Sequence, residues 1–148
     1  AEYLKASGAE EIALVGYSTG AILTLLALGK SDVFSGGFAA FGGGDIAQLI
    51  QESPIAEDLR ECLGSLDELE AKLAEFEPCN YAKNVRPEDL YMVNGLMDPI
   101  VPKEYAQRFL DKMQSNPEMH WLEADHFDDS VFDHLAQFTA AFQKRSRP

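Results

Sequence analysis

The chain has 148 residues, 46% of them apolar and 25% charged, which is typical of one soluble globular domain and excludes a disordered chain. Its formal net charge of −13 argues against a nucleic-acid-binding protein, because phosphate binding needs clustered lysine and arginine. No apolar stretch reaches the roughly 20 residues that cross a bilayer, and no signal peptide is recognisable, so we expect a cytoplasmic protein without a membrane span.

Short apolar runs alternate with helical patterns along the chain. A short continuous apolar run is typical of a strand buried on both faces of a sheet. Apolar residues spaced by three and four indicate a helix, and Gly8 is a natural end for the first one. In chain order we expect a helix at 2–7, a strand at 11–16, a helix at 21–29, a strand at 36–41, a helix at 46–52, a strand at 90–94, a helix at 103–114, a strand at 119–123 and a helix at 130–144.

A more polar segment between the second and third strands is expected to form a helical, lid-like insert over residues 53–84. Asp45 is expected to cap the helix just before this insert. Within the insert, Ser65 and Glu68 have the spacing of a capping box. Cysteines 62 and 79 are expected to be free thiols in a reducing compartment, because a chain of this length builds a core without disulfides.

Strands that alternate with helices predict right-handed crossovers between parallel strands, with helices on both faces of the sheet. We therefore expect an α/β fold, as a single domain over residues 1–148. In open sheets of this kind, active groups gather at the carboxyl ends of the strands.

One such end carries the sequence Gly16-Tyr17-Ser18-Thr19-Gly20, between the first strand and the helix that follows. Gly-x-Ser-x-Gly in this position is typical of a nucleophile elbow, a tight turn that holds the serine hydroxyl clear of the sheet. The backbone N–H of Thr19 is then the expected donor to an oxyanion, and Tyr17 is expected to contact the substrate. The alternative is an ordinary turn in which Ser18 has no chemical role.

A serine nucleophile needs a base, and the base needs a carboxylate that orients it. Asp98 follows the third strand and His126 follows the fourth, so both are placed at the same edge as Ser18. The order Ser, Asp, His is that of the α/β-hydrolases. The alternatives are that Asp98 only begins the turn at Pro99 and that His126 is a surface residue. His120, facing outward, and His134 are expected to be structural.

Several segments resemble the α/β-hydrolase family. "GYSTGA" resembles its nucleophile elbow, "YMVNGLMDPIVP" the strand and loop with its acid, and "WLEADHF" the segment with its histidine. "FAAFGGGDIAQLIQES" and "EPCNYAKNVRPEDLYMVNG" are similar to dienelactone-hydrolase-like and acetyl-esterase-like members. The resemblance covers nearly the whole chain but only the C-terminal half of that fold.

This resemblance implies a serine hydrolase that cleaves small carboxylic esters or thioesters through an acyl-enzyme, with Ser18, His126 and Asp98 as its triad. It also implies that the first four strands of the fold lie upstream of this sequence, together with the loop that supplies a second oxyanion donor. The first strand here would then have an open edge. We expect that edge to pair with a complementary N-terminal segment or a second copy.

Two other functions are compatible with the same residues. The chain is alternatively a noncatalytic hydrolase fragment or an interaction module, and acyl transfer to an alcohol would use the same triad. Neither a metal nor a cofactor is expected. The acidic residues of "DHFDDSVFDH" suit the start of a helix, and Gly42-Gly43-Gly44 lacks a phosphate-binding motif and is expected to be a close-packed loop.

Overall fold

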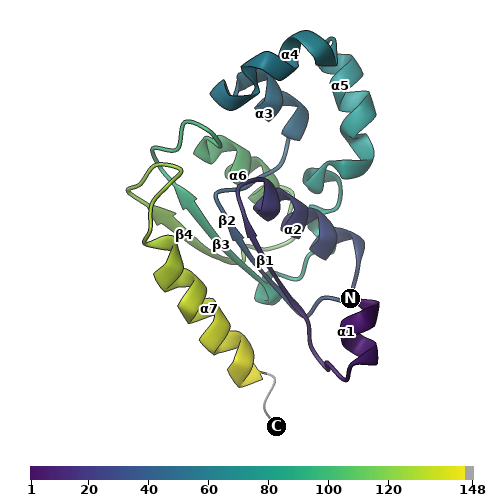
Figure 1. Ribbon diagram of the computed structural model, residues 1–148, viewed down its shortest axis with the longest axis vertical. Helices are drawn as coiled ribbons and strands as arrows, with labels where there is room; N and C mark the ends of the chain where they lie inside the picture. Colours follow the sequence, from purple (N-terminus) through teal and green to yellow (C-terminus); the bar gives the residue numbers. More distant parts are fainter. Residues whose placement is uncertain (146–148) are drawn as a thin grey trace.

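The computed structural model describes residues 1–145, without the side chains of residues 59–61. Four strands form one parallel sheet in the order β1-β2-β3-β4 (Figure 1). They are β1 (Ala13–Tyr17), β2 (Gly36–Ala40), β3 (Leu90–Gly95) and β4 (Glu118–Leu122). The expected α/β fold is confirmed.

Helices cover both faces of this sheet. On one face, α2 (Thr19–Lys30) and α6 (Lys103–Leu110) pack their Leu25 and Phe109 side chains against alternate residues of β2 and β3. On the other face, α7 (Val131–Arg145) packs Phe138 against the remaining residues of β2 and β3, whose side chains point to that side (Figure 1). Side chains of a strand alternate between the two faces, so each central strand contributes to two apolar clusters. The short α1 (Glu2–Ala6) precedes β1.

The insert lies beyond the carboxyl ends of the strands, at the top of Figure 1. It consists of α4 (Glu57–Leu63), α5 (Leu66–Leu73) and short 3₁₀ turns, and it follows α3 (Ile46–Glu52). The turns here and before β3 span Pro54–Ala56, Ala74–Phe76, Pro78–Asn80, Ala82–Asn84 and Pro87–Asp89. The segment is largely helical, and its capping box is present: Ser65 accepts from the Glu68 N–H and Glu68 from the Ser65 N–H; a role as a lid stays a prediction.

Asp45 occupies the N-cap position of α3 as predicted, but its side chain does not supply the cap bond. Asp45 has a left-handed backbone with φ of 59°, and its side chain makes no cap bond; it pairs with Arg108 instead. The carboxylate of Glu77 accepts the backbone N–H groups of Asp45 and Ile46 at 2.7 and 2.8 Å. Glu77 also accepts the Cys79 N–H at 2.8 Å, so one carboxylate ties the end of the insert to the start of α3.

Two further expectations differ from the structure. β1 is not buried on both faces: Val15 is 59% exposed, because α7, the helix on that face, packs against β2 and β3 while β1 lies at the edge of the sheet within residues 1–145. The helix expected at 103–114 ends at Leu110, where the N–H groups of Lys112 and Met113 donate to carbonyls only three residues back. Both cysteines are free thiols, as predicted.

Within the described range, none of the helices combines the length and the apolar character that crossing a membrane requires. The cytoplasmic location stays a prediction.

Candidate active site

Ser18 occupies the turn between β1 and α2, and its backbone is in an uncommon conformation. Its φ of 55° and ψ of −121° place it in a region that side-chain-bearing residues rarely adopt. The turn is fixed from both sides, since the Ser18 N–H donates to the Ala40 carbonyl at 2.8 Å and the Ser18 carbonyl accepts from the Ala21 N–H at 2.9 Å. This strained turn holds the Ser18 hydroxyl at the carboxyl edge of the sheet.

The two glycines of the motif are not equivalent. A Cβ atom on Gly16 would lie 2.0 Å from the Gly20 carbonyl oxygen and 2.5 Å from Oγ1 of Thr24. A Cβ atom on Gly20 would meet nothing within 4 Å. Gly16 is therefore what lets α2 approach β1 closely enough to form the turn.

The three side chains expected to act together are hydrogen-bonded to one another. Nε2 of His126 lies 2.9 Å from Oγ of Ser18, and Nδ1 lies 2.7 Å from Oδ2 of Asp98. His126 is 2% exposed and Asp98 5%, so water has little access to the pair. An imidazole held in this way can take a proton from the hydroxyl while the carboxylate stabilises its charged form.

Asp98 has a fixed orientation because its second oxygen is also bonded. Oδ1 accepts the backbone N–H groups of Ile100 and Val101 at 2.8 and 2.9 Å. The loop that carries Asp98 is tied to the segment after β4, where the Met97 N–H donates to the Ala124 carbonyl at 3.1 Å. The acid and the base are thus held by neighbouring loops at one edge of the sheet.

Three aromatic rings surround the His126 imidazole. The centroids of Tyr17, Phe41 and Phe127 lie 5.6, 5.5 and 5.3 Å from that of His126, with interplanar angles of 68°, 61° and 87°. Such edge-on contacts restrict how the imidazole can turn. The Tyr17 hydroxyl also donates to the backbone carbonyl of His126. Tyr17 was expected to contact substrate, which stays a prediction, and its observed contact is with the base.

Thr19 begins α2, so its backbone N–H has no carbonyl of the same helix to donate to. The N-terminus of a helix also carries a partial positive charge that favours an anion. Both features suit the predicted role of Thr19 as an oxyanion donor.

The loop around His126 is acidic. Asp125 accepts the Phe127 N–H at 3.0 Å, which closes a turn over the histidine. Burial raises the pKa of the Tyr17 hydroxyl, and the charges of Asp98, Asp125 and two further aspartates of this loop raise it again.

Within residues 1–145, no group of three or more histidine, cysteine or acidic side chains is arranged to hold a metal ion.

The other two histidines lie away from this site. His120 is not turned outward as expected, because its ring stacks on Tyr91 at 4.8 Å and lies 4.6 Å from the ring of His134. Burial lowers the pKa of His134, and the nearby His120 lowers it further. The pair packs between β4 and α7.

Residues 2–130 match the model of the prolyl oligopeptidase family. The chain belongs to this family. Its members are α/β-hydrolases, so the resemblance noted in the sequence is confirmed at the level of that superfamily. A comparison with curated protein sequences finds no match.

Solved structures with the same fold include peptidases and an esterase. An acylaminoacyl peptidase of Pyrococcus horikoshii superposes with a TM-score of 0.75 at 23% identity, over 96% of this chain and 26% of its own. A puromycin-hydrolyzing peptidase of Mycobacterium tuberculosis gives 0.71 at 21%, over 93% of this chain and 22% of its own. Acetyl xylan esterase 1 of Thermoanaerobacterium sp. JW/SL YS485 gives 0.71 at 16%, over 86% and 44%. This member of the prolyl oligopeptidase family therefore spans about a quarter of the length of the two peptidases.

Proposed function

We propose that this chain carries the nucleophile, base and acid of a serine hydrolase that cleaves carboxylic esters or thioesters. The observation that supports this most is the continuous hydrogen-bonded chain from Oγ of Ser18 through His126 to Asp98. Each of the three side chains follows a different strand, so this alignment requires the whole sheet.

In the proposed first step, Oγ of Ser18 attacks the carbonyl carbon of the ester while its proton passes to Nε2 of His126. Asp98 stabilises the imidazolium that forms, and the Thr19 N–H donates to the oxyanion. The bond to the leaving alkoxide or thiolate then breaks as His126 returns the proton to it, which leaves an acyl-enzyme. Water, deprotonated by His126, then attacks the acyl carbon. The bond from that carbon to Oγ of Ser18 breaks as His126 returns the proton to Oγ, and the carboxylic acid is released.

Cleavage of peptide bonds is a second candidate, favoured by the match to the prolyl oligopeptidase family and by the two peptidases among the structural relatives. The same residues would act in the same order, with an amine as the leaving group. An amide makes a greater demand on the oxyanion donors, because its leaving group is poorer.

The alternative to an enzyme is a noncatalytic hydrolase fragment or an interaction module. It is favoured by β1, which pairs only with β2 within residues 1–145 and which exposes the side chains of Val15 and Tyr17. An unpaired strand edge is a template for pairing with another chain. We expect a complementary N-terminal segment or a second copy of this chain to pair with the edge of β1. The mass of the protein in solution tests whether a second copy binds.

Hydrolysis of p-nitrophenyl butyrate by the full chain, beside Ser18→Ala, tests the ester proposal. We expect turnover that Ser18→Ala abolishes. A folded chain whose turnover equals that of Ser18→Ala would contradict it. An acetylated dipeptide p-nitroanilide tests the peptidase candidate under the same conditions.

A further inference from the structure

Phe41 follows β2 directly and breaks the alternation of that strand. Along β2, the side chains of Phe38 and Ala40 lie on the face of the sheet that α7 covers, and Ala39 lies on the face that α2 covers. Continued alternation would place residue 41 on the α2 face. Its backbone instead has a φ of 55°, and its ring is buried in the cluster on the α7 face. The left-handed backbone therefore returns the ring to the side on which Phe38 lies.

A positive φ is uncommon for a residue with a bulky side chain, because it brings Cβ close to the following carbonyl oxygen. Three glycines follow Phe41, at positions 42–44, and glycine adopts a positive φ without this clash. Within residues 1–145, however, the glycines with a positive φ are Gly8 and Gly64. The strain thus falls on the residue that carries the ring, and strain of this kind is concentrated at functional sites.

The ring that this conformation places is in contact with the proposed base. Its centroid lies 5.5 Å from that of the His126 imidazole, at an interplanar angle of 61°, and 5.3 Å from that of Tyr17. A Cβ atom on Gly95 would lie 3.1 Å from Cε1 of Phe41, so the glycine leaves room for the ring. A ring on the α2 face would make neither of the two aromatic contacts.

A buried asparagine of β3 holds the backbone next to Phe41. Nδ2 of Asn94 donates to the Gly42 carbonyl at 2.9 Å, and Asn94 is 0% exposed. Its Oδ1 accepts no hydrogen bond within the part of the chain that the structure describes, and a buried polar atom without a partner lowers stability. The bond to Gly42 is therefore what asparagine contributes here that an apolar side chain cannot. The Phe41 N–H donates to the Val93 carbonyl at 2.8 Å, so β3 holds two successive residues of this turn.

We propose that Phe41 is a positioning residue for His126, and that Asn94 acts through Phe41 by holding its left-handed backbone. The inference rests on the proposed function, because it takes His126 as the base. The imidazole must keep Nε2 on Oγ of Ser18 and Nδ1 on Oδ2 of Asp98 at the same time. An imidazole that tilts loses one of these bonds, and the Phe41 ring occupies the space into which it would tilt.

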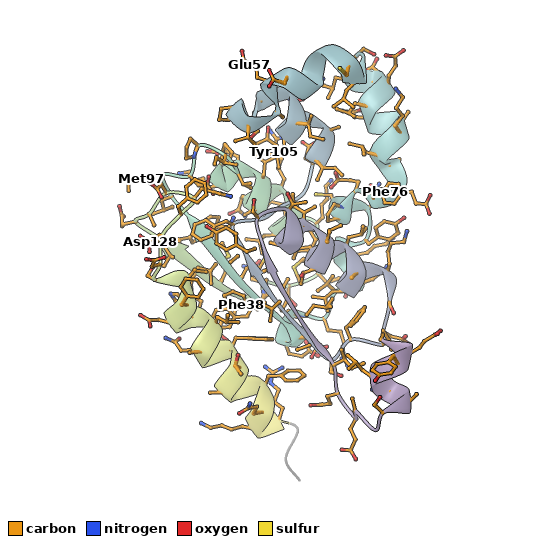
Figure 2. The ribbon with its side chains drawn as sticks, viewed as in Figure 1. Phe38, Glu57, Phe76, Met97, Tyr105 and Asp128 are labelled. Carbon is orange, nitrogen blue, oxygen red and sulfur yellow. The ribbon has the colours of Figure 1, made fainter. Side chains whose placement is uncertain are left out.

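The kinetic test measures the rate at which a fluorophosphonate labels Ser18 in the full chain. Phe41→Leu removes the ring but keeps an apolar side chain, and it is expected to lower the rate at least about ten-fold. Phe38→Leu is the matched control and is expected to label within about two-fold of the wild type. Phe38, labelled in Figure 2, belongs to the same strand and cluster, and its ring contacts Tyr91 and Phe138. Equal rates in the two folded variants would overturn the proposal.

Asn94→Leu tests the same route with the ring in place, and it keeps the test decisive if Phe41→Leu does not fold. Loss of the donor is expected to slow labelling at least about three-fold. Asn84→Leu is the control, because Nδ2 of Asn84 also donates to a glycine carbonyl, that of Gly29 at 3.0 Å, away from the site. If Asn94 acts through Phe41, the double variant labels no more slowly than Phe41→Leu alone. Effects that multiply in the double variant, or equal rates in Asn94→Leu and Asn84→Leu, would overturn the role of Asn94.

Proton NMR separates this inference from the proposed function. The Nδ1 proton of His126, bonded to the Asp98 carboxylate, resonates far downfield of the amide protons while the bond protects it from exchange with water, and the spectrum of His126→Ala assigns the signal. We expect the signal in the wild type and in Phe38→Leu, and its loss in Phe41→Leu. That loss, in a protein whose wild type takes no label, would keep the positioning role and reject the hydrolase. An unchanged signal in Phe41→Leu, in a protein whose wild type is labelled, would keep the hydrolase and overturn the positioning role.

Discussion

The hydroxyl of Tyr17 donates a hydrogen bond to the backbone carbonyl of His126, and the imidazole of His126 is hydrogen-bonded to Ser18. Tyr17, which precedes Ser18 in the chain, thus contacts the proposed base directly. These two residues are 109 positions apart in the chain. The Tyr17 ring also packs edge-on against the His126 imidazole and lies 5.3 Å from the ring of Phe41. The strand that ends in the nucleophile thus helps to position the base.

Tyr17→Phe is expected to slow the reaction of Ser18 with a fluorophosphonate about three- to ten-fold and to lower the free energy of unfolding by about 1–2 kcal/mol. The ring contacts remain in this variant, so both changes report the lost hydroxyl. Tyr81→Phe is the matched control, because the Tyr81 hydroxyl also donates to a backbone carbonyl, that of Glu75, away from the site. Equal labelling rates in the two variants would show that Tyr17 does not position the base.

The strained backbone of Ser18 predicts a difference between two variants that both remove the hydroxyl. Ser18→Gly is expected to be about 1 kcal/mol more stable than Ser18→Ala, since only glycine adopts φ of 55° and ψ of −121° without strain. Urea unfolding of the two variants measures this difference. Ser18→Ala as stable as Ser18→Gly would contradict the strained turn.

The two glycines of the elbow are expected to respond in opposite ways to the same change. Gly16→Ala should lower the free energy of unfolding by about 3 kcal/mol, because its methyl group would overlap the Gly20 carbonyl. Gly20→Ala should be neutral or up to about 1 kcal/mol more stable, since its methyl group meets open space at the start of a helix. Thermal unfolding of both variants tests this, and similar losses would contradict the close approach at Gly16.

Alkaline pH is expected to destabilise the fold through Cys79. Burial, and then the charge of Glu77, raise the pKa of this thiol to about 12 from the usual 9.0. The unfolded chain therefore loses the thiol proton at a lower pH than the folded chain does. Where the folded chain holds one proton more than the unfolded chain, the free energy of unfolding falls by up to about 1.4 kcal/mol per pH unit. Cys79 thus contributes stability that is complete below pH 9 and is lost as pH rises toward 12.

Urea unfolding at pH 8, 9, 10 and 11 measures this slope. Cys79→Ala should give a shallower loss over the same range, although the buried tyrosines still contribute. Cys62→Ala is the control, because Cys62 is exposed. The same slope in both variants would contradict the account of Cys79.

The sequence allowed the order of strands and helices to be predicted, and with it the edge where Ser18, Asp98 and His126 meet. This was possible because parallel strands place all their carboxyl ends together, so three residues far apart in the chain converge without any further information. The distances between them depend on loop conformation, which residue spacing does not determine.

The features that were mispredicted depend on neighbours that are distant in the sequence. The apolar run of β1 indicates burial on both faces, but burial of a strand depends on which helices cover those faces, and α7 covers β2 and β3. Residue spacing correctly places Asp45 at the N-cap of α3, but the carboxylate that bonds the first N–H groups belongs to Glu77, 31 positions from Ile46. The contact of Tyr17 with His126 likewise has no signal in residue spacing.

The most direct test of the central proposal is labelling of the full chain by a fluorophosphonate probe, followed by mass spectrometry of the labelled peptide. We expect one label on Ser18, none in Ser18→Ala, and a labelling rate at least about 10³-fold lower in His126→Ala. Circular dichroism of each protein establishes that it is folded. A folded wild-type chain that takes no label, or takes it at another residue, would contradict the proposal that Ser18, His126 and Asp98 act as one site.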